Sequence, residues 1–116
     1  MNEEKSVYLL MTLSVRICSA EEVEQTKDLL ISGLEKFAQI DQMRALDFRF
    51  CFLENAHCPS FPLDYHLHFH CVVKLRGRRP SCKVVQDCWR QACGLDYDPV
   101  VDVRKLSGFV ANAYRW

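Results

Sequence analysis

The chain has 116 residues, of which 49% are apolar, and its 15 basic and 15 acidic residues give a formal net charge of zero. This length suits one domain with one core, so a single domain over residues 1–116 is expected. No run approaches the roughly 20 apolar residues of a membrane span, and the charged start from Met1 to Ser6 does not resemble a signal peptide. We therefore expect a soluble, intracellular protein with no membrane partner, whose balanced charge gives no global signal for nucleic acid.

Seven cysteines make an odd number, and none of them forms a C-x-x-C pair of the zinc-ribbon or thioredoxin kind. Most fall within apolar patterns, which suits reduced thiols in a core. A disulfide between some of them stays open at this stage, since some intracellular proteins of hyperthermophiles contain such bonds.

The first half of the chain predicts a strand, a helix and a second strand. Val7–Val15 is a nearly continuous apolar and β-branched run, as in a central strand covered on both faces. Ser19 and Glu22 have the spacing of a capping box, and apolar residues then recur at helical intervals to about Ile40. From Leu46 to Glu54 the pattern alternates, which indicates a strand with two different faces.

Alternation along this second strand predicts which residues share a face. It places Leu46, Phe48, Phe50 and Phe52 on one face, and Asp47, Arg49 and Cys51 on the other. Glu54 follows the phenylalanine face, where a carboxylate next to buried material needs a metal or a cation as partner. The alternative is that Glu54 already lies past the strand end, in solvent.

The second half predicts a connection, a strand, a helix, a strand and a terminal helix. These are Asn55–Asp64, Tyr65–Leu75, Ser81–Cys93, Val100–Arg104 and Leu106–Trp116. The connection should make the two long strands an antiparallel pair, with Glu54 beside the histidines of the second. The order β-α-β-β-α-β-α predicts an α+β fold, namely a ferredoxin-like antiparallel sheet (split βαβ) with an appended helix.

Three of the four histidines stand at alternate positions in the strand Tyr65–Leu75. Because alternate residues share a face, His66, His68 and His70 line up opposite an unbroken apolar face. Neutral imidazole is a common metal ligand, and two at this spacing on a rigid strand can bind one ion if a carboxylate approaches from a neighbouring strand. A half-solvated sheet face is the plainer alternative, but three histidines among core residues favour a metal site.

A basic cluster follows the histidine strand directly. Its members, which could pair with phosphates, include Arg76, Arg78, Arg79 and Lys83. Taken alone, such a cluster is more often an ordinary solvated loop.

At several places the residues resemble the HUH endonucleases, most closely the replication initiators (Rep proteins) of rolling-circle plasmids and viruses. Leu10–Val15 is similar to the family's first strand motif, and Phe52–Glu54 to its acidic strand. His66–His70 resembles its motif of two histidines around a hydrophobic residue. Asp96–Arg104 resembles the stretch before its catalytic helix, and Gly108–Trp116 stands where that helix bears the nucleophilic tyrosine.

This resemblance implies roles for individual residues. His68, His70 and Glu54 would bind a divalent ion, Mn²⁺ or Mg²⁺, with His66 as a neighbour. Tyr114 would attack a phosphodiester of single-stranded DNA at a replication origin, giving a 5′-phosphotyrosine link that a second hydroxyl can reverse. The basic cluster would contact DNA, a homodimer could cut and rejoin two ends, and the location would be a prokaryotic cytoplasm.

Two alternatives stay open. The first is a metal-containing DNA-binding domain that does not cut, because some alignments place Phe109 or Ala113 at the position of the nucleophile and the motif's lysine is absent. The second is a structural zinc site in which Cys71 or Cys58 joins His68, His70 or His57.

Overall fold

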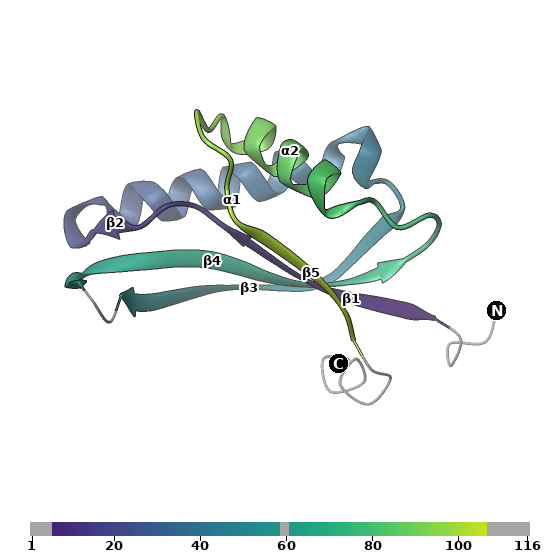
Figure 1. The fold of residues 1–116 in the computed structure, drawn as a ribbon, viewed down its shortest axis with the longest axis horizontal. Helices are drawn as coiled ribbons and strands as arrows, with labels where there is room; N and C mark the ends of the chain where they lie inside the picture. The colour runs from purple at the N-terminus through teal and green to yellow at the C-terminus, as the bar shows by residue number, and fades with distance from the viewer. Residues whose placement is uncertain (1–5, 59–60, 107–116) are drawn as a thin grey trace.

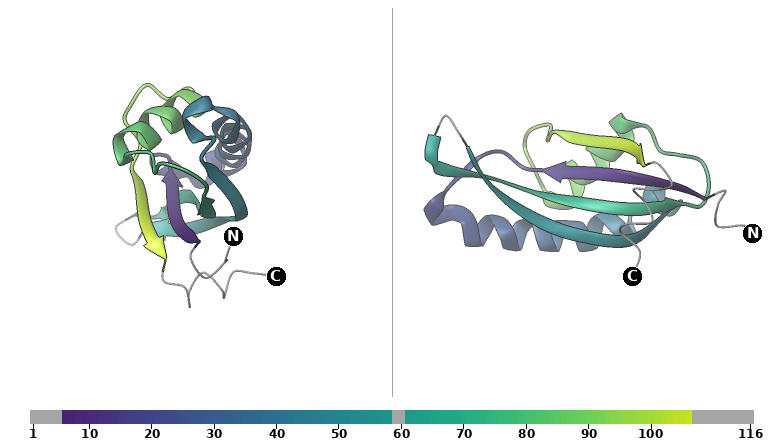
Figure 2. Two further views of the ribbon diagram at one scale, coloured as in Figure 1. Left: turned by 90° about the vertical axis from the view of Figure 1, so that its right-hand side faces the viewer. Right: turned by 90° about the horizontal axis from the view of Figure 1, so that it is seen from below.

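The structure, a computed structural model, describes residues 6–58 and 61–106. Its elements are β1 (Val7–Ser14), β2 (Cys18–Ser19), η2 (Ala20–Glu22), α1 (Val23–Gln39), η3 (Asp41–Met43), β3 (Leu46–Cys58), β4 (Phe61–Leu75), α2 (Cys82–Cys93) and β5 (Val101–Leu106). They form two layers, with both α-helices on the same side of the sheet (Figures 1 and 2). No helix in the described residues is long and apolar enough to cross a membrane.

The sheet is antiparallel, and its long strands follow the order β3-β4-β1-β5. The short β2 continues the line of β1 and pairs with the start of β4. This is the strand order of a split βαβ unit, because β1 and β4 lie together in the middle although 46 residues separate Ser14 from Phe61 in the chain. The predicted α+β, ferredoxin-like fold is confirmed. The predicted terminal helix lies outside the described residues from position 107 onward.

The two faces of the sheet differ in composition. On the face toward the helices, four alternate β4 residues are buried in the core: Leu67, Phe69, Cys71 and Val73. Their neighbours His66, His68 and His70 point to the opposite surface, which we call the histidine face. That face also carries a smaller apolar cluster around Tyr8 and Val72. Among residues 6–58 and 61–106, helices cover only one face of the first strand, so the predicted cover on its second face finds no counterpart in this part of the chain.

A β-bulge at Arg49 corrects the predicted faces of β3. Phe48 pairs with Val73 and Phe50 with Val72, so Arg49 is an extra residue on β3 and the alternation reverses there. Leu46 and Phe48 accordingly pack in the main core, whereas Phe50 belongs to the cluster on the histidine face. The predicted single row of aromatic residues was wrong, because one inserted residue exchanges the two faces of a strand.

The helices begin and end close to the predicted places. Ser19 and Glu22 form the predicted capping box, but its first turn is the 3₁₀ helix η2, and α1 starts at Val23. The Ser81 hydroxyl caps α2 by accepting from the N–H of Val84, and Gly94 ends it with a φ of 66°, a conformation that suits glycine. Trp89 of α2 is fully buried and donates to the backbone oxygen of Ser14, which fixes α2 on the end of β1.

Two boundaries differ more. The predicted connection over 55–64 is mostly strand, since β3 reaches Cys58 and β4 begins at Phe61. Leu106, predicted at the start of a helical stripe, is instead the last residue of β5. Pairing with a neighbouring strand overrides the weak local signals of polar residues and prolines at these places.

Candidate metal centre

Glu54, His68 and His70 come together on the histidine face from two paired strands. Glu54 of β3 stands directly opposite His68 of β4, and His70 is the next residue along the same face. The Oε2 atom of Glu54 lies 2.7 Å from Nε2 of His70 and 3.4 Å from Nε2 of His68. The three ligand atoms all lie within 4.8 Å of one another, and in the described residues this is the one such group of histidine, cysteine and acidic side chains. The predicted pairing that places Glu54 beside the histidines is confirmed.

The group of Glu54, His68 and His70 is closed on the side of the sheet and open on the side of the solvent. The side chains of His68 and His70 are 14% and 18% exposed, whereas that of Glu54 is 47% exposed. Glu54 is therefore neither buried nor isolated in solvent: it stands at the rim of the pair of imidazoles. A molecule arriving from solvent can reach the carboxylate without any movement of the strands.

The pKa shifts of Glu54 and His68 favour protonation states that can bind a cation. Burial, with a further contribution from the neighbouring His70, lowers the pKa of His68, so this imidazole stays neutral at neutral pH. The hydrogen bond with His70 lowers the pKa of Glu54, so the carboxylate stays ionised. A neutral imidazole nitrogen and an ionised carboxylate are the protonation states in which these side chains bind metal ions.

The orientation of His70 is set by two further side chains on the histidine face. Its Nδ1 lies 3.3 Å from the hydroxyl oxygen of Thr12, the residue opposite it on β1. The ring of Phe52 stacks on its imidazole, with 5.0 Å between ring centroids and 30° between planes. A partner on one ring nitrogen determines which nitrogen is free for a ligand, so Thr12 directs Nε2 of His70 toward Glu54.

These residues fit a divalent cation. Ligands bonded at about 2.1 Å to one ion lie no more than about 4.2 Å apart, so the observed group needs only small rotations to surround one. Two imidazoles and one carboxylate are a donor set that first-row divalent metals accept, with coordination positions left for water or substrate. Cys71, one of the thiols considered for a zinc site, is buried on the opposite face of β4, where it hydrogen-bonds to Cys51.

With Mn²⁺ as the probe of this candidate site, replacing Thr12 with valine should weaken metal binding by about tenfold or more, because outer partners of ligating histidines typically contribute factors of 10–100. Valine has nearly the volume of threonine but no hydroxyl to hold Nδ1 of His70. Titration calorimetry with Mn²⁺ measures the effect, and Thr12→Ser, which keeps the hydroxyl, should bind like the wild type. Equal affinities for the valine and serine variants would show that the hydroxyl does not position His70.

The predicted basic cluster lies away from this group. Arg76 follows the end of β4, six residues beyond His70, which is about 20 Å along a strand. Two of its members form ion pairs within the chain, since Arg76 pairs with Asp47 and Lys83 with Asp87. Arg79 donates to the backbone oxygen of Val103. Arg78 is exposed and forms no ion pair with the described part of the chain.

Some predicted site residues fall outside the described part of the chain. These are Tyr114, together with Phe109 and Ala113 as alternative positions for the nucleophile. The side chains of His57 and Cys58, considered for a zinc site, lie outside it as well.

Sequence reasoning missed two contributors to the site. Thr12 and Phe52 contact His70 from different strands. A signal for Thr12 was present, because it is the one polar residue between Tyr8 and Leu13 in an otherwise apolar strand, and such a residue tends to face a polar partner.

The chain is similar to two curated Rep proteins. "Protein rep" from a Bacillus species is 25% identical over 109 residues, which cover 87% of this chain and 34% of the relative. "Protein rep" from Bacillus amyloliquefaciens is 24% identical over 111 residues, which cover 89% of this chain and 32% of the relative. The chain thus spans about a third of the length of these relatives. No protein-family model matches it, and no solved structure does.

Proposed function

We propose that this chain is a metal-dependent endonuclease of a replication initiator, which nicks and rejoins single-stranded DNA at an origin. The observation that carries the proposal is the group formed by Glu54, His68 and His70 on the histidine face. Similarity to two Rep proteins over nearly the whole chain supports the biological setting. As a working hypothesis, residues 1–116 form one nuclease domain of the HUH type.

The site explains why these residue types would serve phosphodiester cleavage. A divalent ion bound by Glu54, His68 and His70 would polarise a phosphoryl oxygen and offset the charge that builds there, and Mn²⁺ or Mg²⁺ would suit this role. The exposed rim at Glu54 leaves room for a DNA strand to reach the site. His68 and His70 lie on a rigid strand whose other face packs in the core. They would therefore keep the position of the phosphate constant from one turnover to the next.

Tyr114 would supply the nucleophile. Its phenol oxygen would form a bond to phosphorus while the bond to the 3′ oxygen breaks, leaving a 5′-phosphotyrosine link and a free 3′-hydroxyl. Attack by another 3′-hydroxyl would reverse the step and rejoin the strand without a nucleotide cofactor. Arg76, Arg78, Arg79 and Lys83 would hold the DNA backbone at the far end of β4, and a homodimer would allow two ends to be exchanged.

A covalent-adduct assay tests this proposal. The protein is incubated with labelled single-stranded DNA from its replicon's origin and MnCl₂, then analysed under denaturing conditions. We expect a labelled protein–DNA adduct with the wild type and none with Tyr114→Phe, because phenylalanine has the same ring without the nucleophilic oxygen. Thermal unfolding of both proteins serves as the control for folding.

Each other outcome rejects part of the proposal. DNA binding without an adduct in either protein would mean that the chain binds and does not cut. An adduct that persists in Tyr114→Phe would place the nucleophile elsewhere. A stoichiometric zinc ion that survives dialysis and is required for folding would indicate a structural site instead.

A further inference from the structure

A pocket lies beside the candidate metal centre, where the end of β1 meets the start of β4 and the loop before β5. It has a volume of about 480 Å³ and is lined by residues that include Ser14, Arg16, Ile17, His66, Tyr97 and Val100. This volume falls within the usual range for sites that bind small molecules. His66 connects the pocket with the candidate metal centre. It lines the pocket, and the centroid of its ring lies 5.6 Å from that of His68.

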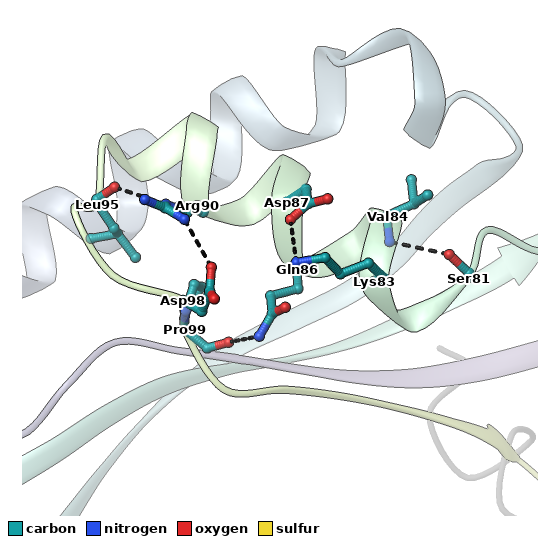
Figure 3. A network of polar contacts seen from close by, with 9 residues as sticks. All are labelled: Ser81, Lys83, Val84, Gln86, Asp87, Arg90, Leu95, Asp98 and Pro99. Carbon is teal, nitrogen blue, oxygen red and sulfur yellow. Dashed lines mark hydrogen bonds and ion pairs between the residues drawn. The ribbon is translucent and has the colours of Figure 1, made fainter.

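The wall formed by the loop 95–100 is held in place from two sides. From α2, Gln86 donates to the backbone oxygen of Pro99 at 2.8 Å, and Arg90 both donates to the oxygen of Leu95 and pairs with Asp98 at 2.9 Å (Figure 3).

From the end of β1, the Ser14 hydroxyl donates to the backbone oxygen of Val100 at 2.6 Å, and from the segment after β1 the N–H of Arg16 donates to the phenol oxygen of Tyr97 at 3.0 Å. A loop tied to both a helix and a strand keeps its shape, so the pocket is largely formed before any ligand arrives.

The lining combines flat and apolar groups with one available cation. The guanidinium of Arg16 lies over the ring of Tyr97, 5.1 Å from its centroid, and forms no ion pair with the described residues. Ile17 and Val100 add exposed apolar surface, at 45% and 74% exposure. Aromatic rings and guanidinium planes stack on nucleobases, while the same guanidinium can pair with a phosphate.

We propose that this pocket binds one nucleobase of the single-stranded DNA, within one nucleotide of the phosphate held at Glu54, His68 and His70. This inference rests on the proposed function and adds to it a residue set that selects the nick site. The base enters the pocket against Tyr97 and Ile17, and Arg16 pairs with the adjoining phosphate. Fixing that base sets which phosphodiester reaches the metal centre, so the pocket determines the position of cleavage.

The test begins with the DNA that the protein prefers. A randomised pool of short single-stranded oligonucleotides is selected for binding to the full chain in MnCl₂, and the enriched sequence is then made with one abasic nucleotide at each position in turn. Dissociation constants are measured with Tyr114→Phe protein so that cleavage does not consume the DNA. We expect one abasic position next to the nick to lose about tenfold or more in affinity, as base stacking typically contributes.

Variants of Tyr97 connect that position to the pocket. Tyr97→Leu removes the ring and should weaken binding to intact DNA by a similar factor. On DNA that lacks the sensitive base, the same substitution should weaken binding little further, because the missing base and the missing ring are the two sides of one contact. Tyr97→Phe is the matched control: it loses the hydrogen bond from the N–H of Arg16 but keeps the ring, so it should still respond to the abasic site as the wild type does. Ile17→Glu, at an exposed side chain, gives a second variant that should weaken intact DNA more than the abasic DNA.

The outcomes separate this inference from the proposed function. The pocket assignment would be overturned if DNA bound tightly but no single abasic position weakened binding. It would also be overturned if the losses of affinity from Tyr97→Leu and from the abasic position simply added. Either result would leave the endonuclease proposal standing. Competition by free mononucleotides at concentrations near the DNA dissociation constant would show a nucleotide site instead. Absence of any single-stranded DNA binding would reject both proposals.

Discussion

Replacing both His68 and His70 with alanine is expected to abolish the proposed Mn²⁺-dependent cleavage and to leave the fold intact. Two of the three candidate ligands disappear, and a single exposed carboxylate at Glu54 is no longer a chelating site. The loss of Mn²⁺ affinity should exceed about 100-fold, since removing outer partners of ligating histidines alone costs factors of 10–100. Both imidazoles lie on the histidine face, away from the core between helices and sheet, so the thermal unfolding temperature should change little.

Titration calorimetry with MnCl₂ and the covalent-adduct assay measure this loss on the same protein samples. His66→Ala is the matched control for the metal titration, because His66 has the same strand face but is not in the group of three ligands. It should bind Mn²⁺ like the wild type. Cleavage at the wild-type rate in the double variant would show that the metal assignment is wrong.

Deleting Arg49 is expected to lower the free energy of unfolding by about 3 kcal/mol or more, and to destroy Mn²⁺ binding. Without the bulge, side chains would alternate between the two faces along the whole of β3. The residues on one side of the deletion would therefore have to exchange faces. Either Leu46 and Phe48 leave the core, or Glu54 turns from the histidine face toward the helices, where an unpaired carboxylate is costly.

A control variant separates the effect of the extra backbone residue from the effect of the Arg49 side chain. Arg49→Ala keeps the bulge and removes an ion pair with Asp47 at a surface position, which contributes at most about 1 kcal/mol. Chemical denaturation monitored by tryptophan fluorescence, together with Mn²⁺ titration, compares the two variants. A deletion variant that unfolds at the same denaturant concentration as Arg49→Ala would show that the bulge does not determine which way Glu54 faces.

Much of the fold could be predicted from local pattern, because the decisive interactions are close in sequence. The capping box of Ser19 and Glu22 and the glycine stop at Gly94 involve residues three or four apart, and each appears in the structure. The alternation that turns His68 and His70 to one face is likewise a property of any straight strand. The order of elements then restricts the topology to a ferredoxin-like sheet.

The sequence by itself determined the two histidines and the order of the elements as far as β5, and it identified Glu54 as a residue in need of a partner. Only the tertiary structure decided on which face Glu54 lies, because the bulge at Arg49 depends on how β3 pairs with β4 and leaves no clear local signal. The hydrogen bond between Thr12 and His70 joins positions 58 residues apart, and the pocket joins three separate segments. Such contacts depend on strand register and on long-range packing, and a single sequence expresses neither of these directly.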